Sequence, residues 1–303
     1  MKTKMELRQL KYFTKVAETL NFSEAARQLF VTQSTLSQQI KLLEEELDTP
    51  LLLRNSHSVS LTEAGSELLP YALRTIQDCE LCVERINDLN NLSVGQLDIG
   101  VTYSFSSILS ETVVAFMRSY PLIRLNVIYK PMTELMDLLA HRDVDFVLAF
   151  RPSFPVENVE SHILFQNRLS VVADYNHPIV EKEKITLDEL AEYDLALPSR
   201  GLQARSTFDA MSAGLRNFRI RIELNEVNIL LKLVRNTRLV TVLAEDSIYG
   251  ENDLKAIPID IPENEMTGCV HILKDTYHKK SMKEFIRMLT ESIAVKSRQN
   301  SWI

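Results

Sequence analysis

A run of hydrogen-bonding side chains between residues 32 and 39 has the chemistry needed to recognise base pairs. Glutamine can pair bidentately with adenine, and serine and threonine hydroxyls can donate to or accept from either base. The predicted base contacts are Gln33, Ser34, Thr35, Ser37 and Gln38. Contacts to phosphates position a protein on DNA without specifying a sequence. The predicted phosphate contacts are Ser23, Arg27, Thr32, Lys41 and Arg54.

A second set of candidate binding residues follows strands that we predict in the C-terminal two thirds of the chain. Ligands of open α/β sheets bind beyond the carboxyl ends of the strands, near helix N-termini. The residues predicted at these places to bind a small-molecule effector are Thr102, Tyr103, Ser104, Lys130, Thr133, Phe150, Arg151, Ser199 and Arg200. Lys130, Arg151 and Arg200 favour an anionic effector, because cationic side chains bind carboxylates. The alternative for each of them is a solvated surface charge.

The sequence offers no arrangement typical of catalysis. It contains no G-x-S-x-G, G-x-x-x-x-G-K-[ST] or H-E-x-x-H pattern, and its six histidines lack ligand spacing. Cys79 and Cys82 form a C-x-x-C, which could be a redox pair or half of a metal site. No second pair completes a zinc site, so two small residues on an apolar helix face are favoured. We expect no enzyme activity, no metal and no cofactor beyond the effector.

Three helices are needed to position the polar run. Apolar residues recur at helical spacing from Leu7 to Ala17, and Ser23 is a suitable N-cap for a short helix over residues 24–30. A third helix begins at Thr32 and ends near Pro50. In a helix-turn-helix the second helix of the pair lies in the major groove, with its N-terminal residues at the base edges. The alternative is a three-helix domain whose polar third helix contacts protein.

A wing and a long helix follow. Residues 51–61 are predicted to form two short strands with His57 near the tip, and Thr62 then caps a helix that continues to about Asn90. The apolar positions of this helix, called here the linker stripe, are Ala64, Leu68, Ala72, Ile76, Cys79, Val83, Ile86 and Leu89. Spacing by three or four favours a seam between two copies. Packing on its own domain is the alternative.

The remainder of the chain alternates strands and helices, which predicts parallel βαβ units. Strands are expected at residues 97–101, 125–129 and 144–149, with helices at 107–119 and 133–141. A second set contains strands at 169–173, 195–197, 220–224 and 239–243, with helices at 187–191, 207–213 and 228–234. The chain closes with a strand near 270–273 and a helix over 280–295. Two lobes are therefore predicted, the second inserted into the first.

Charge is unevenly distributed along the 303 residues. The net charge is −7, but residues 1–65 contain eight basic and eight acidic side chains. Weak phosphate attraction by a neutral N-terminal unit favours binding as a homodimer or homotetramer. The N-terminus shows no apolar stretch of a signal peptide, and no run is long enough to span a bilayer. We therefore expect a cytoplasmic protein with no membrane partner.

The first 65 residues closely resemble the LysR-type transcriptional regulators. The matching segments are Leu10-x-x-Phe13, Asn21 to Leu29, Gln33 to Leu47, Pro50 to Arg54 and Leu61 to Gly65. The resemblance implies a winged helix-turn-helix, mainly α, then a long dimerising linker helix. A two-lobed α/β effector domain similar to periplasmic binding proteins is implied for the rest. It further implies an oligomer on double-stranded promoter DNA, controlled by a small-molecule co-inducer.

The sequence departs from the family at several positions. Asp48 stands where glycine is common, Gln38 where arginine is common, and His57 where a basic residue is common. Residues 234–239 lack the usual glycine-rich turn.

The predicted domains are 1–61 for DNA binding, 62–91 for the linker helix and 95–303 for the effector. Lobe one comprises about 95–166 and 270–303, and lobe two about 167–269. The predicted function is sequence-specific regulation of transcription. Two rival hypotheses are an enzyme built on the α/β part and a binding protein whose N-terminal unit contacts protein instead of DNA.

Overall fold

The computed structural model describes residues 5–54, 59–89, 94–152, 155–213, 218–248, 250–261 and 264–300. The chain divides into two compact units, Met1–Leu89 and Asn90–Ile303. Each has its own hydrophobic core. His57, at the predicted wing tip, lies outside the described residues.

The first unit begins with three helices, α1 (Leu7–Thr19), α2 (Phe22–Gln28) and α3 (Gln33–Leu47). The inward faces of α1 and α3 meet in a core that includes the fully buried Phe13, Leu36 and Ile40. Helix α2 begins earlier than predicted, because Asn21 and not Ser23 is its N-cap. The Asn21 side chain accepts hydrogen bonds from the backbone N–H groups of Ser23 and Glu24. The assignment of Ser23 as the cap was therefore wrong.

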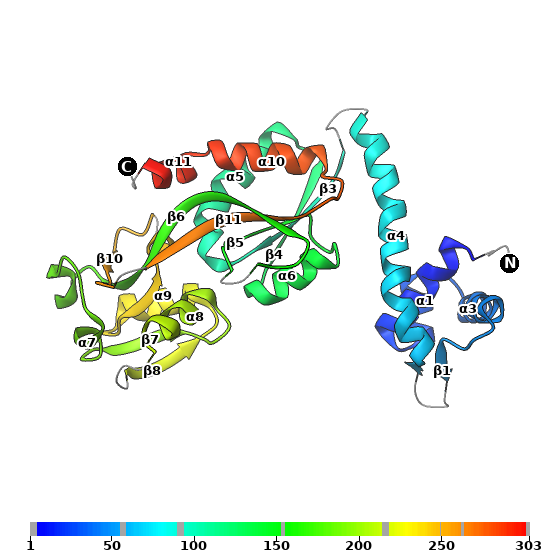
Figure 1. Ribbon diagram of the computed structural model, residues 1–303, viewed down its shortest axis with the longest axis horizontal. Helices are drawn as coiled ribbons and strands as arrows, with labels where there is room; N and C mark the ends of the chain where they lie inside the picture. Colours follow the sequence, from blue (N-terminus) through cyan, green and yellow to red (C-terminus); the bar gives the residue numbers. More distant parts are fainter. Residues whose placement is uncertain are drawn as a thin grey trace. The chain divides into compact units, whose positions relative to one another are not determined.

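The predicted wing and long helix are both present. Strands β1 (Leu52–Arg54) and β2 (Val59–Leu61) pair antiparallel. Helix α4 (Glu63–Leu89) follows, and the Thr62 hydroxyl caps it by accepting a hydrogen bond from the Gly65 N–H. Figure 1 shows the first half of α4 lying along α1, with which it is in contact.

The linker stripe has two different environments. Ala72 is buried in the core of the first unit, and Ala64, Leu68 and Ile76 pack against that core. Farther along the helix, the stripe is exposed: Cys79 is exposed, Val83 is 60% exposed and Ile86 is 59% exposed. The first half of the stripe therefore packs on its own domain, which was the alternative to a dimer seam. An apolar surface remains on the second half.

The first lobe of the second unit is a sheet covered by helices. Strand β3 (Gly95–Val101) lies between β4 (Ile123–Tyr129) and β5 (Phe146–Phe150) and is parallel to both. Helices α5 (Ser106–Ser119) and α6 (Met132–Ala140) make the crossovers. The short 3-10 helix η1 (Tyr103–Phe105) joins β3 to α5 at the carboxyl end of the strand. The parallel βαβ prediction is confirmed here.

The second lobe repeats this arrangement. Strand β7 (Asp194–Pro198) pairs parallel with β8 (Arg219–Leu224) and forms a parallel bridge toward β9 (Thr241–Ala244). Helices α8 (Gln203–Met211) and α9 (Val227–Asn236) connect these strands, and α7 (Leu187–Leu190) precedes them. The 3-10 helices η2 (Pro178–Glu181) and η3 (Glu245–Ile248) complete the lobe.

Two long strands run side by side between the lobes, as Figure 1 shows. Strand β6 (Val159–Asp174) pairs with β11 (Glu265–Leu273) along residues 159–168. Beyond that, β6 pairs with β9 and with β10 (Leu254–Pro258), a strand that the sequence analysis missed. The expected strand at 169–173 is thus only the second half of β6. The first half has the polar residues 160–162 near its start and contains an apolar run of only three residues, 163–165.

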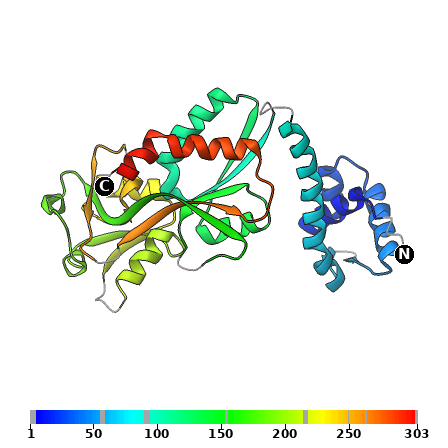
Figure 2. The ribbon, with the colours of Figure 1, turned by 45° about the horizontal axis from the view of Figure 1, so that its top comes forward.

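The C-terminal segment forms two helices instead of the single helix that was expected. Helix α10 (Lys280–Glu291) packs against α5 and lies beside it in Figures 1 and 2. Ser292 has an extended backbone, which ends α10, and its hydroxyl accepts a hydrogen bond from the Val295 N–H. The Glu111 carboxylate also accepts from the first N–H groups of α11 (Ile293–Asn300). These two acceptors at the helix start explain the break.

Candidate nucleic-acid interface and effector pocket

The N-terminal end of α3 presents a polar surface. Gln33, Ser34, Thr35 and Gln38 are exposed, whereas Leu36 is fully buried. The hydroxyl of Thr32 caps the helix by accepting from the Thr35 N–H at 3.2 Å. Because this cap fixes the first turn, the polar side chains project from a defined helix end and not from a frayed one.

Hydrogen bonds join this helix end to α2. The Ser23 hydroxyl donates to Oε1 of Gln33 at 3.1 Å. The Thr32 oxygen lies 3.0 Å from the Ser34 hydroxyl and 2.8 Å from that of Thr35. Small Ala25 and Ala26 are buried in the core to which both helices contribute. The two helices are thereby held together in a helix-turn-helix.

The three cations predicted to contact phosphates all have acidic neighbours. Arg27 forms a two-pronged hydrogen bond to Glu24, at 2.9 and 2.6 Å, and this bond lowers the pKa of Glu24 to about 2. Lys41 lies 3.5 Å from Glu45. Arg54 lies 3.1 Å from Glu44. Each of these cations is thus partly neutralised by its own neighbour, which limits non-specific attraction to DNA.

Arg54 is held by contacts on two sides. Its guanidinium donates to the Ser37 hydroxyl at 2.9 Å and lies 4.6 Å from the centre of the Phe22 ring. Ser37, predicted to contact a base, is half-buried and is therefore engaged with the wing in this structure. The wing is joined to α3 through this arginine.

Glu44 is a structural residue of this surface that the sequence analysis did not assign. One oxygen, Oε1, accepts from the backbone N–H groups of Leu51 and Leu52 at 2.9 and 3.1 Å. The other, Oε2, accepts from Arg54 at 3.1 Å. A carboxylate near the end of a polar helix resembles an ordinary surface charge in sequence, so spacing alone gave no signal.

A tight corner joins the wing to α4. The Thr62 hydroxyl donates to the Pro50 carbonyl at 2.7 Å, and the Thr62 N–H donates to the Leu51 carbonyl at 3.0 Å. A Cβ atom on Gly65 would lie 2.1 Å from that Leu51 oxygen. Only glycine fits there without moving backbone, which explains the glycine that ends the run from Leu61 to Gly65.

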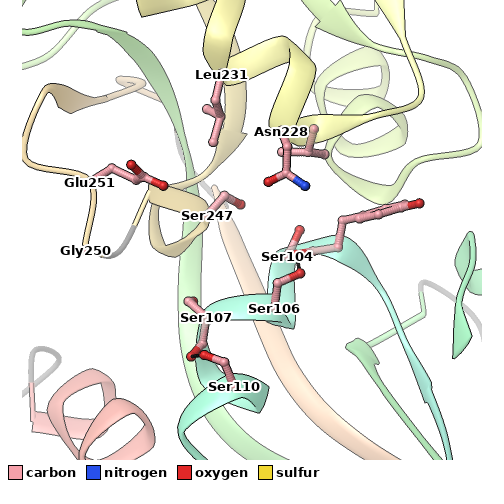
Figure 3. Close-up of a pocket in the computed structure, with 11 residues that line it drawn as sticks. Ser104, Ser106, Ser107, Ser110, Asn228, Leu231, Ser247, Gly250 and Glu251 are labelled. Carbon is pink, nitrogen blue, oxygen red and sulfur yellow. Dashed lines mark hydrogen bonds between the residues drawn. The ribbon is translucent and has the colours of Figure 1, made fainter. Parts of the chain in front are cut away.

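The second unit contains a cavity of about 470 Å³. Its walls come from η1 and the first turns of α5 in lobe one, from α9 in lobe two and from the η3 segment. The lining residues are Tyr103, Ser104, Ser106, Ser107, Ser110, Val227, Asn228, Leu231, Ser247, Gly250 and Glu251. Figure 3 shows Ser104 and Asn228 facing one another across it. Volumes of this size are typical of small-molecule sites.

Two buried hydroxyl oxygens of the pocket lack partners among the described residues, Oγ of Ser107 and Oγ of Ser247. Buried polar groups are nearly always hydrogen-bonded, and leaving one unpaired costs free energy. The single charged side chain in the described lining, Glu251, is hydrogen-bonded to Arg235. The described lining residues therefore give the pocket several serine hydroxyls and the Asn228 amide, with no cation among them.

The predicted effector residues are dispersed. Tyr103 and Ser104 line the cavity, and the Tyr103 ring stacks on Tyr129 at 5.4 Å. Thr102 is buried at the end of β3, where its hydroxyl is 3.4 Å from the Leu148 carbonyl. Thr133 and Arg200 are exposed and Ser199 is half-buried; none lines this cavity.

The remaining predicted contacts have other neighbours. Lys130 pairs with Glu134 at 2.8 Å, and this hydrogen bond raises the pKa of Lys130. The exposed Arg151 accepts a hydrogen bond on its carbonyl from Gln203, 3.3 Å away. Phe150 was predicted to face the ligand, but its ring is 1% exposed and packs against Phe105 and Phe165. The assignment of Phe150 to the ligand was therefore wrong, because its side chain is part of the hydrophobic core.

Other potential sites are sparse in the part of the chain that the structure describes. No group of three or more His, Cys, Asp or Glu side chains could hold a metal ion there. No described helix is both long and apolar enough for a membrane span. Cys79 and Cys82 are free and exposed on α4.

Comparison with known families assigns the chain to one class. Residues 7–66 match the bacterial regulatory helix-turn-helix model of the lysR family, and residues 90–294 match the LysR substrate binding domain. The protein therefore belongs to the LysR family of DNA-binding transcriptional regulators, which are not enzymes, and combines the helix-turn-helix with an effector-binding domain.

Individual relatives are moderately similar. The chain is 30% identical over 269 residues to the transcriptional dual regulator GltC of Bacillus subtilis, covering 87% of this chain and 89% of GltC. It is 29% identical over 224 residues to the transcriptional activator CmpR of Synechocystis, covering 73% of each. A match to the uncharacterized regulator YnfL of Escherichia coli is 33% identical and covers 62% of this chain and 64% of YnfL.

Solved structures share the fold. A full-length OxyR variant from Pseudomonas aeruginosa superposes with a TM-score of 0.67 at 20% identity, covering 96% of this chain and 95% of that one. CbnR in complex with its target DNA gives a TM-score of 0.65 at 21% identity, covering 97% and 100%.

Proposed function

We propose that the N-terminal end of α3 enters the major groove and that Gln33, Ser34 and Gln38 contact base edges. The observation that supports this is the exposed polar first turn of α3, capped by Thr32 and joined to α2 through Ser23. Thr35 and Ser37 complete the set, and Ser23, Arg27, Thr32, Lys41 and Arg54 are assigned to phosphates. Base contacts give specificity, and phosphate contacts give position.

This assignment is tested by comparing two variants on a specific site and on random DNA. Gln33→Ala should weaken specific binding by about 1–3 kcal/mol for each lost base contact and leave random DNA nearly unaffected. Lys41→Ala should weaken both alike and lower the salt dependence. Identical effects of the two variants on both DNAs would contradict the groove assignment.

We further propose that the exposed half of the linker stripe is a contact between copies. Val83 and Ile86 expose most of their apolar surface on a helix whose earlier stripe residues are buried or partly buried. Two copies would double the number of DNA contacts made by a unit with no net charge. Sedimentation of Val83→Glu should then show a smaller species than the wild type; a homotetramer would require additional surfaces.

We place the effector in the 470 Å³ cavity between α5, α9 and η3. The serine hydroxyls and the Asn228 amide of the lining suit a ligand that both donates and accepts hydrogen bonds. An uncharged hydroxyl-bearing compound fits better than an anion, because Glu251 is the one charged side chain in the described lining and Lys130, Arg151 and Arg200 are not part of that lining. The anionic effector of the sequence analysis is thereby the second candidate.

Thermal-shift measurements separate these classes. Wild type and Ser107→Ala are compared with neutral sugars and with organic acids such as citrate. Stabilisation of the wild type by a neutral sugar, lost in Ser107→Ala, would support the pocket assignment. Stabilisation by acids that is unchanged in Ser107→Ala and lost in Arg151→Ala would refute it.

The effector can shift the regulator between states only by its differential affinity for them. We propose action in the cytoplasm, where promoter DNA is available.

A further inference from the structure

One aromatic side chain beside the recognition helix is almost completely exposed. Phe30 lies in the turn between α2 and α3 and is 95% exposed. Its backbone is left-handed, with φ of 56°. Both properties are unusual for phenylalanine, because this conformation favours glycine or asparagine and large apolar side chains are normally buried.

The fold of the first unit gains no burial from this ring. The neighbours Leu29 and Val31 pack against the core, whereas Phe30 does not. The turn is closed by backbone bonds, in which the Phe30 N–H donates to Arg27 and the Val31 N–H to Ala26. Glycine would adopt the same turn at lower conformational cost. Folding of the first unit therefore does not explain why an aromatic residue stands at this position.

The position of the turn indicates what the ring contacts. Phe30 precedes the cap residue Thr32 by two positions, and Gln33 begins the helix that we place in the groove. A turn at that end of the helix lies at the rim of the groove, beside the sugar-phosphate backbone. The apolar surfaces of duplex DNA near that rim are deoxyribose carbons and thymine methyl groups.

We propose that Phe30 packs its ring on apolar carbon surface of duplex DNA and so adds an uncharged anchor to the interface. This inference rests on the proposed placement of α3. An apolar anchor suits a segment in which Arg27, Lys41 and Arg54 all have acidic neighbours. Its contribution does not depend on counterion release, so it persists when salt weakens the phosphate contacts.

Full-length Phe30→Asn and Phe30→Gly are the variants that test the proposal, because both residues suit the left-handed backbone. On an operator selected in vitro by the wild type, each should bind about tenfold more weakly, as expected when part of a ring loses burial. The dependence of log affinity on log salt should be unchanged. The thermal midpoint should be equal or higher.

Leu20→Gly is the matched control. Leu20 is also exposed, at 50%, and has a left-handed φ of 49°, but it ends α1 and is not in the α2–α3 turn. Unchanged binding by Phe30→Asn, or an equal loss in Leu20→Gly, would overturn the inference while leaving the groove assignment intact. A change of oligomeric state in Phe30→Asn would also overturn it, since the ring would then contact a second copy.

Two further probes identify the contacted surface. If the ring contacts a thymine methyl, replacing thymidine by deoxyuridine in the operator weakens the wild type and not Phe30→Asn, as in a double-mutant cycle. If the ring contacts deoxyribose, the substitution affects neither protein. Failure of the wild type to bind any selected site would instead refute the proposed function itself.

Discussion

Glu44 determines how the wing is attached, so replacing it should open the wing locally. In Glu44→Ala the backbone N–H groups of Leu51 and Leu52 lose their acceptor, and both residues are at most 4% exposed. An unsatisfied buried donor costs about 1–3 kcal/mol, so the two together cost about 2–4 kcal/mol after partial relaxation. The ion pair with Arg54, whose side chain is 35% exposed, adds only about 0.5 kcal/mol.

Glu44→Gln separates these contributions. The amide oxygen can still accept from both N–H groups and loses only the charge, so the expected cost is about 1 kcal/mol. Hydrogen exchange measured by mass spectrometry on peptides covering residues 48–54 reports the opening directly. Glu44→Ala should exchange about 30- to 1000-fold faster than the wild type, and Glu44→Gln about fivefold faster.

The neighbouring Glu45 provides the control. It is exposed and lies 3.5 Å from Lys41, so Glu45→Ala should leave exchange in the wing unchanged. Equal exchange in Glu44→Ala and Glu44→Gln would refute the argument, because it would mean that the two backbone hydrogen bonds contribute nothing measurable.

Three other results are expected. Gly65→Ala should lower the thermal midpoint of the first unit and impair DNA binding, because its Cβ would lie 2.1 Å from the Leu51 carbonyl oxygen; unchanged stability by circular dichroism would refute the tight corner. Alkylation at pH 8 should modify the exposed Cys82, which is not in the linker stripe, and spare Cys269, since burial raises the pKa of that thiol to about 11; equally rapid labelling of these two thiols would disagree. Burial lowers the pKa of His271 below 6.5, so the unfolded state binds the proton first as the pH falls. The free energy of unfolding should therefore decrease as the pH drops below about 6.5. His271→Gln should flatten this dependence in urea titrations.

The sequence predicted those elements whose side chains follow a simple period. Helices α1, α3 and α4 and strands β3 to β5 are amphipathic or continuously apolar, and the predicted ranges agree within a few residues. Asn21 and Ser23 are both good capping residues two positions apart, so composition could not choose between them. The first half of β6 and the whole of β10 were missed, because polar residues interrupt their apolar runs.

The two candidate sites differ in how much the sequence could show. The surface of α3 is one continuous helix turn, so its polar face was visible in the run from residue 32 to 39. The cavity combines segments near residues 104–110, 227–231 and 247–251, and only Tyr103 and Ser104 were named in advance. Spacing in the linker stripe likewise could not distinguish the buried Ala72 from the exposed Val83.

The most direct test of the central claim is selection of binding sites from a random DNA library by the wild type and by Gln38→Arg. Gln38 is exposed on the face of α3 that we place at the base edges. Arginine pairs bidentately with guanine, so the variant should select guanine at one position of each half-site and keep the remaining bases. Identical selected sequences from the two proteins, or a loss of preference at every position, would contradict recognition by the N-terminal end of α3.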